Sequence, residues 1–136
     1  MSDSLDPVGG RPAGEVYDWY VRGLRLLDDG HAAAAAELLA HAVAADPDSA
    51  SIREAVGRAR LGARRYDEAR ADFAWLVEAY PDDDFAHFGL GLALSRLGRH
   101  AAAGEQLALA CALRPDREDY ARELHHVRAT LRARSS

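Results

Sequence analysis

The side chains that could do chemistry in this chain are two adjacent histidines, a run of three acids and a single cysteine. His125 and His126 follow Glu123 in a segment with helical spacing, and imidazole together with carboxylate is a common ligand set for zinc. Neighbouring positions on a helix point about 100° apart, and no third ligand stands at a suitable spacing. We therefore interpret these side chains as titratable groups on the surface.

The acidic run is Asp82, Asp83 and Asp84. A calcium loop needs ligands at alternating positions and a terminal glutamate, and this run has neither. Because it stands where a helix is expected to begin, we predict that it caps that helix. Cys111 lies between two alanines and is predicted to be a small buried residue rather than a nucleophile. One cysteine also excludes an internal disulfide.

Motifs of the common enzyme classes are missing from the sequence. No glycine-rich phosphate loop follows a strand pattern, no Gly-x-Ser-x-Gly motif is present, and paired-cysteine metal sites are excluded. We therefore expect no enzymatic activity, no cofactor and no metal.

Composition and charge describe one compact domain. Of 136 residues, 49% are hydrophobic and 29% charged, which is enough for a core and a solvated surface. The 17 basic and 22 acidic side chains leave a charge of −5, which disfavours nucleic acid as a partner. No apolar run approaches a membrane span, and the polar start differs from a secretory signal. We expect a cytoplasmic protein, and the 29 alanines with no lysine or asparagine suggest a bacterial genome rich in G and C.

Four columns of residues recur along the chain with a step of 34. Apolar residues between them have helical spacing, and Gly30 and Gly98 mark a break midway through two of the repeats. Each repeat is therefore predicted to hold two helices. The columns are Gly23, Gly57 and Gly91; Ala35, Ala69 and Ala103; Pro47, Pro81 and Pro115; and Asp48, Asp82 and Asp116. The expected helices are 16–29, 32–45, 49–62, 66–79, 83–97 and 100–113.

The small residues in these columns predict close packing of each helix pair. Glycine in the first helix and alanine in the second leave little bulk where the helices cross, so their axes can approach toward the short end of the usual range of about 8–10 Å. Proline ends the second helix, and the acid after it is expected to cap the next helix.

This pattern resembles the tetratricopeptide repeat, from about residue 16 to residue 115. The residues that carry the likeness are Trp19, Gly23, Ala35, Leu39, Ala42, Pro47, Phe73, Pro81, Leu90, Gly91, Leu94, Ala103, Leu107, Ala110 and Pro115. The resemblance implies an all-α fold, a right-handed α-solenoid of three helix-turn-helix repeats at about 16–49, 50–83 and 84–117. The later repeats depart from the pattern at Arg53 and His87, which replace Trp19, and at Leu76, which replaces a small residue.

The two ends of the stack are expected to differ. Tyr120, Leu124, Val127 and Leu131 have helical spacing, which predicts a seventh, capping helix at about 117–134, as terminal repeats require. Residues 1–14 are rich in proline and glycine and have the composition of a flexible tail. The folded domain is therefore expected at 15–134.

The resemblance also implies that the first helices of successive repeats line a concave groove. Its inward residues here would be Tyr17, Tyr20, Leu24, Glu54, Arg58, Phe85, Phe88 and Leu92, with Ser51 beside them. Rigid aromatic rings supply contact area at small entropic cost. Family members that bind chaperones clamp a terminal carboxylate with lysine, asparagine and arginine, and the matching faces here lack that clamp.

The resulting hypothesis is a non-catalytic interaction module that binds a protein or peptide, such as an amphipathic helix, in this groove and acts as an adaptor or scaffold. Two alternatives stay open. One is a small secretion-type chaperone that shelters an apolar client segment, and the other is a structural subunit that assembles into a homo-oligomer. The sequence also leaves open whether the protein's own tail covers the groove.

Overall fold

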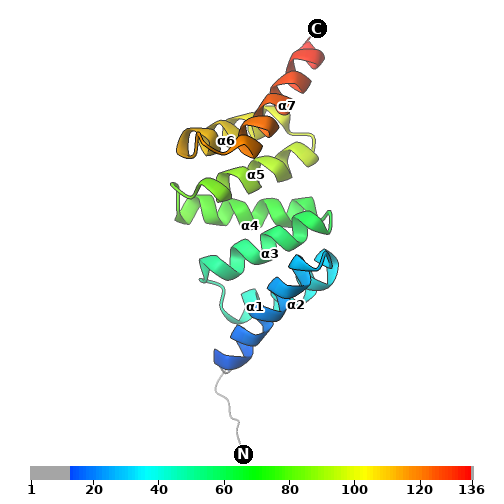
Figure 1. Cartoon of the computed structure of the whole chain (residues 1–136), viewed down its shortest axis with the longest axis vertical. Helices are drawn as coiled ribbons and strands as arrows, with labels where there is room; N and C mark the ends of the chain where they lie inside the picture. Colours follow the sequence, from blue (N-terminus) through cyan, green and yellow to red (C-terminus); the bar gives the residue numbers. More distant parts are fainter. Residues whose placement is uncertain (1–12, 136) are drawn as a thin grey trace, which may run out of the picture. The chain divides into compact units, whose positions relative to one another are not determined.

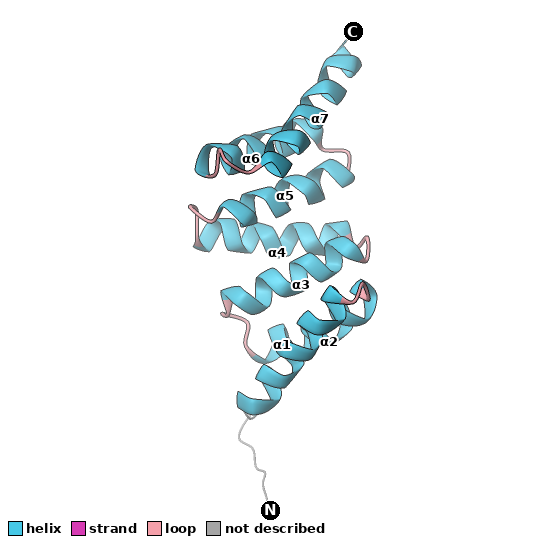
Figure 2. Ribbon diagram, in the orientation of Figure 1, coloured by secondary structure: helices cyan, strands magenta, loops and turns pink. Residues whose placement is uncertain are grey.

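The structure is a computed structural model that describes residues 13–135, and all the elements in this range are α-helices (Figures 1 and 2). They form two compact units. Unit 1 ends at Ala63 and unit 2 begins at Arg64. Unit 1 holds α1 (Ala13–Asp28), α2 (Ala32–Ala45) and α3 (Ala50–Gly62); unit 2 holds α4 (Tyr66–Ala79), α5 (Asp84–Arg96), α6 (His100–Leu113) and α7 (Glu118–Ser135).

The all-α prediction is confirmed, and α2, α4 and α6 have the predicted bounds. The first helix begins earlier than predicted, because Ala13 and Gly14 belong to α1 rather than to a tail. The rest of the predicted tail, residues 1–12, lies outside the described residues.

Glycine allows close contact between paired helices in both units. A Cβ atom on Gly23 of α1 would lie 2.5 Å from Cγ of Leu39 in α2. A Cβ atom on Gly91 of α5 would lie 2.7 Å from Cγ of Leu107 in α6 and 3.3 Å from a backbone oxygen. Both leucines are fully buried. The close packing predicted from the glycine column is therefore present in α1–α2 and in α5–α6.

The turn inside each repeat requires one residue in the left-handed region. Gly30 and Gly98 have φ of +85° and +82°, and Arg64, in the same column, has φ of +63°. After α1, the N–H groups of Gly30 and His31 donate to the carbonyls of Leu27 and Leu26, the paired bonds of a glycine-ended helix. Arginine in this conformation costs about 1–2 kcal/mol relative to glycine.

Helix capping differs by one residue from the prediction. Ser49 Oγ accepts a hydrogen bond from the Ile52 N–H at 3.2 Å, and Asp83 Oδ1 accepts one from the Ala86 N–H at 3.1 Å. The helices after these residues begin at Ala50 and Asp84, so Asp48 and Asp82 stand one residue too early to cap them. Within the acidic run, Asp83 is the capping residue.

The two polar residues that replace Trp19 hold the turn before their own helix. Arg53 Nη2 donates to the Pro47 carbonyl at 3.0 Å, and His87 Nε2 donates to the Pro81 carbonyl at 2.7 Å. The buried His87 ring also lies 2.8 Å, through Nδ1, from Gln106 Oε1 in α6. These departures from the family pattern therefore supply a new contact at the same position.

The last helix packs on α5 and α6 and buries Tyr120, Leu124 and Val127. Tyr120 is fully buried, and its ring stacks on Phe88 of α5 at 4.5 Å between centroids. Its hydroxyl donates to Asp84 Oδ2 at 2.6 Å. Burial and this hydrogen bond raise the pKa of Tyr120 well above its usual value.

The close contact at Gly91 predicts opposite effects for two glycine substitutions in unit 2. Gly91→Ala should lower the free energy of unfolding by about 1–2 kcal/mol, because the added methyl group displaces Leu107. Gly104→Ala in α6 is the control, since its Cβ would meet only Val127 at 3.8 Å. It should raise stability by about 0.5–1 kcal/mol through helix propensity. Urea unfolding followed by circular dichroism measures both, and stabilisation by both would contradict the close contact.

The Tyr120–Asp84 pair predicts a dependence of stability on alkaline pH. Because the folded-state pKa of Tyr120 is raised, the folded chain keeps this proton above pH 10 while the unfolded chain releases it. Stability from this group is complete below about pH 10 and is lost as the pH rises toward the folded-state pKa. Its slope is at most about 1.4 kcal/mol per pH unit.

Tyr120→Phe tests this effect. At pH 7 it should cost about 1.5–3 kcal/mol, because the Asp84 carboxylate loses its donor. Above pH 10 the variant should lose stability less steeply than the native chain, as measured by urea unfolding over a pH series. Parallel pH profiles would show that the phenol has an ordinary pKa in the folded state.

Candidate functional site

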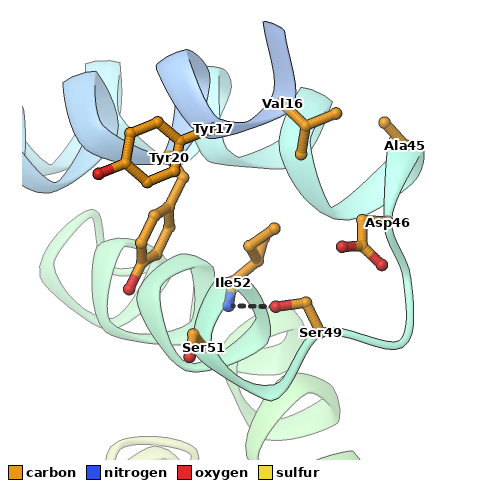
Figure 3. Close-up of a pocket in the computed structure, with 8 residues that line it drawn as sticks. All are labelled: Val16, Tyr17, Tyr20, Ala45, Asp46, Ser49, Ser51 and Ile52. Carbon is orange, nitrogen blue, oxygen red and sulfur yellow. Dashed lines mark hydrogen bonds between the residues drawn. The ribbon is translucent and has the colours of Figure 1, made fainter. Parts of the chain in front are cut away.

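A pocket of about 380 Å³ lies in unit 1, between the first turns of α1, the α2–α3 turn and the start of α3 (Figure 3). Each of these elements contributes two or three residues. The lining residues are Val16, Tyr17 and Tyr20 from α1; Ala45, Asp46 and Ser49 from the end of α2 and the turn; and Ser51 and Ile52 from α3.

Local structure places these side chains. Tyr20 follows Tyr17 by three positions and Val16 by four, so the three side chains share one face of α1. The Ser49 cap fixes the start of α3 and leaves Ile52, 6% exposed, at the inner side of the pocket (Figure 3). Tyr20 packs partly against the core of unit 1, whereas Tyr17 is 67% exposed.

The pocket lining carries a negative charge. Asp46 is the charged residue among those that line it, and the remaining polar groups are the hydroxyls of two serines and two tyrosines. Phenol rings on one side and a carboxylate on the other suit a ligand with both an apolar and a cationic part.

Tyr17 and Tyr20 of the predicted groove, and Ser51 that was predicted beside them, lie in this pocket. Leu24 packs against the core of unit 1, and Glu54 and Arg58 are half-buried on α3. Sequence reasoning did not find Val16, Ala45, Asp46, Ser49 or Ile52 as lining residues. The proline column marks the turn that carries Asp46 and Ser49, and that signal could have placed this turn beside α1.

The groove residues of unit 2 have a different environment. Phe88 was predicted to face the groove, but it is 8% exposed because Tyr120 of α7 covers its ring. Phe85 is half-buried, with its ring 6.0 Å from Phe73 and 6.1 Å from Phe88. Leu92 is half-buried on α5. Phe88 is therefore a core residue of unit 2.

The other chemically capable residues are not gathered into a site. No group of three or more His, Cys, Asp or Glu within residues 13–135 is arranged to hold a metal ion. His125 and His126 are exposed on α7. Cys111 is half-buried rather than buried as predicted. Its partial burial raises the pKa of the thiol, so the thiolate needed for nucleophilic attack is disfavoured. None of the described helices is long and apolar enough to span a membrane.

Alanine substitutions should separate the core ring from the surface ring. Phe88→Ala should destabilise the protein by about 3–5 kcal/mol, because it opens a cavity against Tyr120. Tyr17→Ala should change stability by no more than about 0.5 kcal/mol, since its ring is mostly exposed. Thermal unfolding followed by circular dichroism measures both. Equal effects would mean that Phe88 is not in the core.

Comparisons with known proteins agree with the repeat pattern. The family described as "Tetratricopeptide repeat" matches residues 55–118. No curated protein sequence matches the chain.

Solved structures share the fold at low sequence identity. MamA from Desulfovibrio magneticus RS-1, from its residue 41 to its end, has a TM-score of 0.81 and 21% identity over 87% of this chain and 67% of that chain. The second repeat domain of human RPAP3, in complex with the HSP70 peptide SGPTIEEVD, has a TM-score of 0.78 and 22% identity over 87% of this chain and 98% of that chain. The first repeat domain of Spaghetti (RPAP3), bound to the HSP90 peptide SRMEEVD, has a TM-score of 0.81 and 16% identity over 92% of this chain and 98% of that chain.

The match to MamA leaves part of that protein uncovered, since this chain spans 66% of a doubly mutated MamA RS-1 chain. The likeness at these identities establishes the fold. The 34-residue period, the helix pairs that pack through glycine and these matches together show that the chain has the fold of tetratricopeptide repeat proteins and that residues 55–118 match that family.

Proposed function

We propose that this protein is a non-catalytic interaction module that binds a peptide or short helix of a partner protein on the α1–α3 side of unit 1. The observation that carries the proposal is the pocket beside Tyr17, a large apolar side chain that is 67% exposed. Isolated exposed rings are common, but a ring at the mouth of a pocket of this volume is typical of recognition surfaces.

The fold supports this proposal. The RPAP3 and Spaghetti domains, which have the same fold, were solved with peptides bound. Peptide binding by a helical repeat uses preformed helix faces, so the protein loses little conformational entropy when the partner binds.

The chemistry of the pocket supports binding without catalysis. Its lining includes two serines and one aspartate but no histidine, cysteine or arginine. A serine nucleophile needs a neighbouring base that is itself oriented by a third group, and this set does not supply one. An adaptor or scaffold is the role that fits such a surface.

The rest of the predicted groove remains a prediction. Leu24, Glu54 and Arg58 would extend the same surface along α1 and α3, and Phe85 and Leu92 would serve a surface on unit 2. Phe88 is left out of this set because its ring lies in the core.

A displayed library of random peptides, selected on the full-length chain, tests the proposal. Tyr17→Ala should weaken binding of a selected peptide by about tenfold or more if its ring is an anchor, as measured by fluorescence anisotropy. The control is Tyr80→Ala, which removes a ring that is 44% exposed in unit 2 and outside the pocket. Equal binding by the two variants, or no selected peptide at all, would contradict the proposed function.

A further inference from the structure

The pocket in unit 1 has a counterpart at the same repeat positions of unit 2. Residues two repeat lengths further along the chain occupy equivalent places on α5, the turn after α6 and α7. Val16, Tyr17 and Tyr20 correspond to Asp84, Phe85 and Phe88; Ala45, Asp46 and Ser49 to Leu113, Arg114 and Arg117; and Ser51 and Ile52 to Asp119 and Tyr120.

In unit 2 this position is filled by the protein itself. Tyr120 stacks on Phe88 and donates its hydroxyl to Asp84. The Arg117 guanidinium lies 4.4 Å from the centre of the Tyr120 ring. Asp119 holds that guanidinium by two hydrogen bonds of 3.0 and 2.8 Å.

In unit 1 smaller side chains stand at the filling positions. Ile52 replaces Tyr120 and Ser49 replaces Arg117, and both line the pocket of about 380 Å³. Ala45, which also lines the pocket, stands where unit 2 has the exposed Leu113. Tyr20, at the position of Phe88, still presents a ring on the α1 side (Figure 3). The pocket and its filled counterpart therefore differ in side-chain size at the positions of Ile52 and Ser49.

The charge beside the two sites is reversed. Unit 2 has Arg114, paired with Asp116 at 2.9 Å, at the position where unit 1 has Asp46. Ser51 stands where Asp119 holds the guanidinium in unit 2. Asp46 is therefore the carboxylate available to a cation that enters the pocket of unit 1.

We propose, building on the function proposed above, that the partner of this pocket is a peptide segment that carries an aromatic residue together with an arginine. Its ring stacks on Tyr20 as Tyr120 stacks on Phe88, and its guanidinium pairs with Asp46. Such a ligand is opposite in charge to the Glu-Glu-Val-Asp ends of the peptides bound by RPAP3 and Spaghetti.

Selection of displayed random peptides on the full-length chain tests the ligand chemistry. Peptides that bind should be enriched in Trp, Tyr or Phe accompanied by Arg. Replacing either residue of a selected peptide by alanine should weaken binding at least about tenfold.

Variants that copy unit 2 test the location. Ile52→Tyr should fill the pocket with the chain's own ring and weaken binding by at least about tenfold. Ala45→Leu copies Leu113 at an exposed position, so it should block the pocket without any change in the core. Asp46→Asn should weaken binding of the arginine-containing peptide. Asp48→Asn, which removes an exposed acid of the same turn outside the pocket lining, should have no effect.

The possible outcomes separate this inference from the proposed function. Selected peptides that are acidic or lack an aromatic residue would overturn the inference while peptide binding stands. Wild-type binding by both Ile52→Tyr and Ala45→Leu would also overturn it. If the mass of the protein in solution rises with concentration and Ala45→Leu abolishes that rise, the occupant of the pocket is a second copy of this chain rather than a foreign peptide, which would overturn the inference. Selection of no peptide would overturn the proposed function and this inference together.

Discussion

The close contact between a glycine on one helix and a leucine on the next is the constraint on which each unit depends. At Gly23–Leu39 and at Gly91–Leu107, even a single added carbon would lie within 3 Å of the leucine side chain. Because the two helices approach so closely, each leucine packs against the neighbouring helix and is fully buried. The close approach also brings the third helix within reach of the first, so that α1 contacts α3 and α5 contacts α7. The pocket and its filled counterpart are formed where those helices meet.

One position in the repeat serves two purposes because side-chain size differs between the units. Tyr120, with the Arg117 guanidinium over its ring, fills the space beside Phe88, and the last helix is held there by stacking, a hydrogen bond and a cation–π contact. Ile52, Ser49 and Ala45 leave the equivalent space open beside Tyr20. The backbone of the turn is similar in both cases, since Asp46 and Arg114 have nearly the same φ and ψ. A core contact and a candidate recognition site are therefore alternatives at the same place in the fold.

Departures from the family pattern satisfy backbone constraints with other residue types. Arg53 and His87 stand where the first repeat has Trp19, and both donate to the carbonyl of the proline that ends the preceding repeat. Arg64 adopts the left-handed conformation that glycine adopts in the other two repeats. The constraint in each case is a backbone one, a carbonyl that needs a donor or a turn that needs a positive φ. Several residue types satisfy it, which explains why the repeat tolerates low sequence identity.

The sequence by itself determined the repeat period, the helices and the helix-packing positions, because each depends on residues close in the chain. Proline ends a helix and glycine allows a second helix to pack closely, whichever residues lie further along the chain. The same repeat period led to Tyr17 and Tyr20. Tertiary structure decided which rings are exposed. Phe88 is core because α7 brings Tyr120 onto it, and the pocket exists because Ala45, Ser49 and Ile52 are small where three elements meet. Both outcomes depend on the size of side chains about 30 residues away, and a pattern read along one helix does not contain that information.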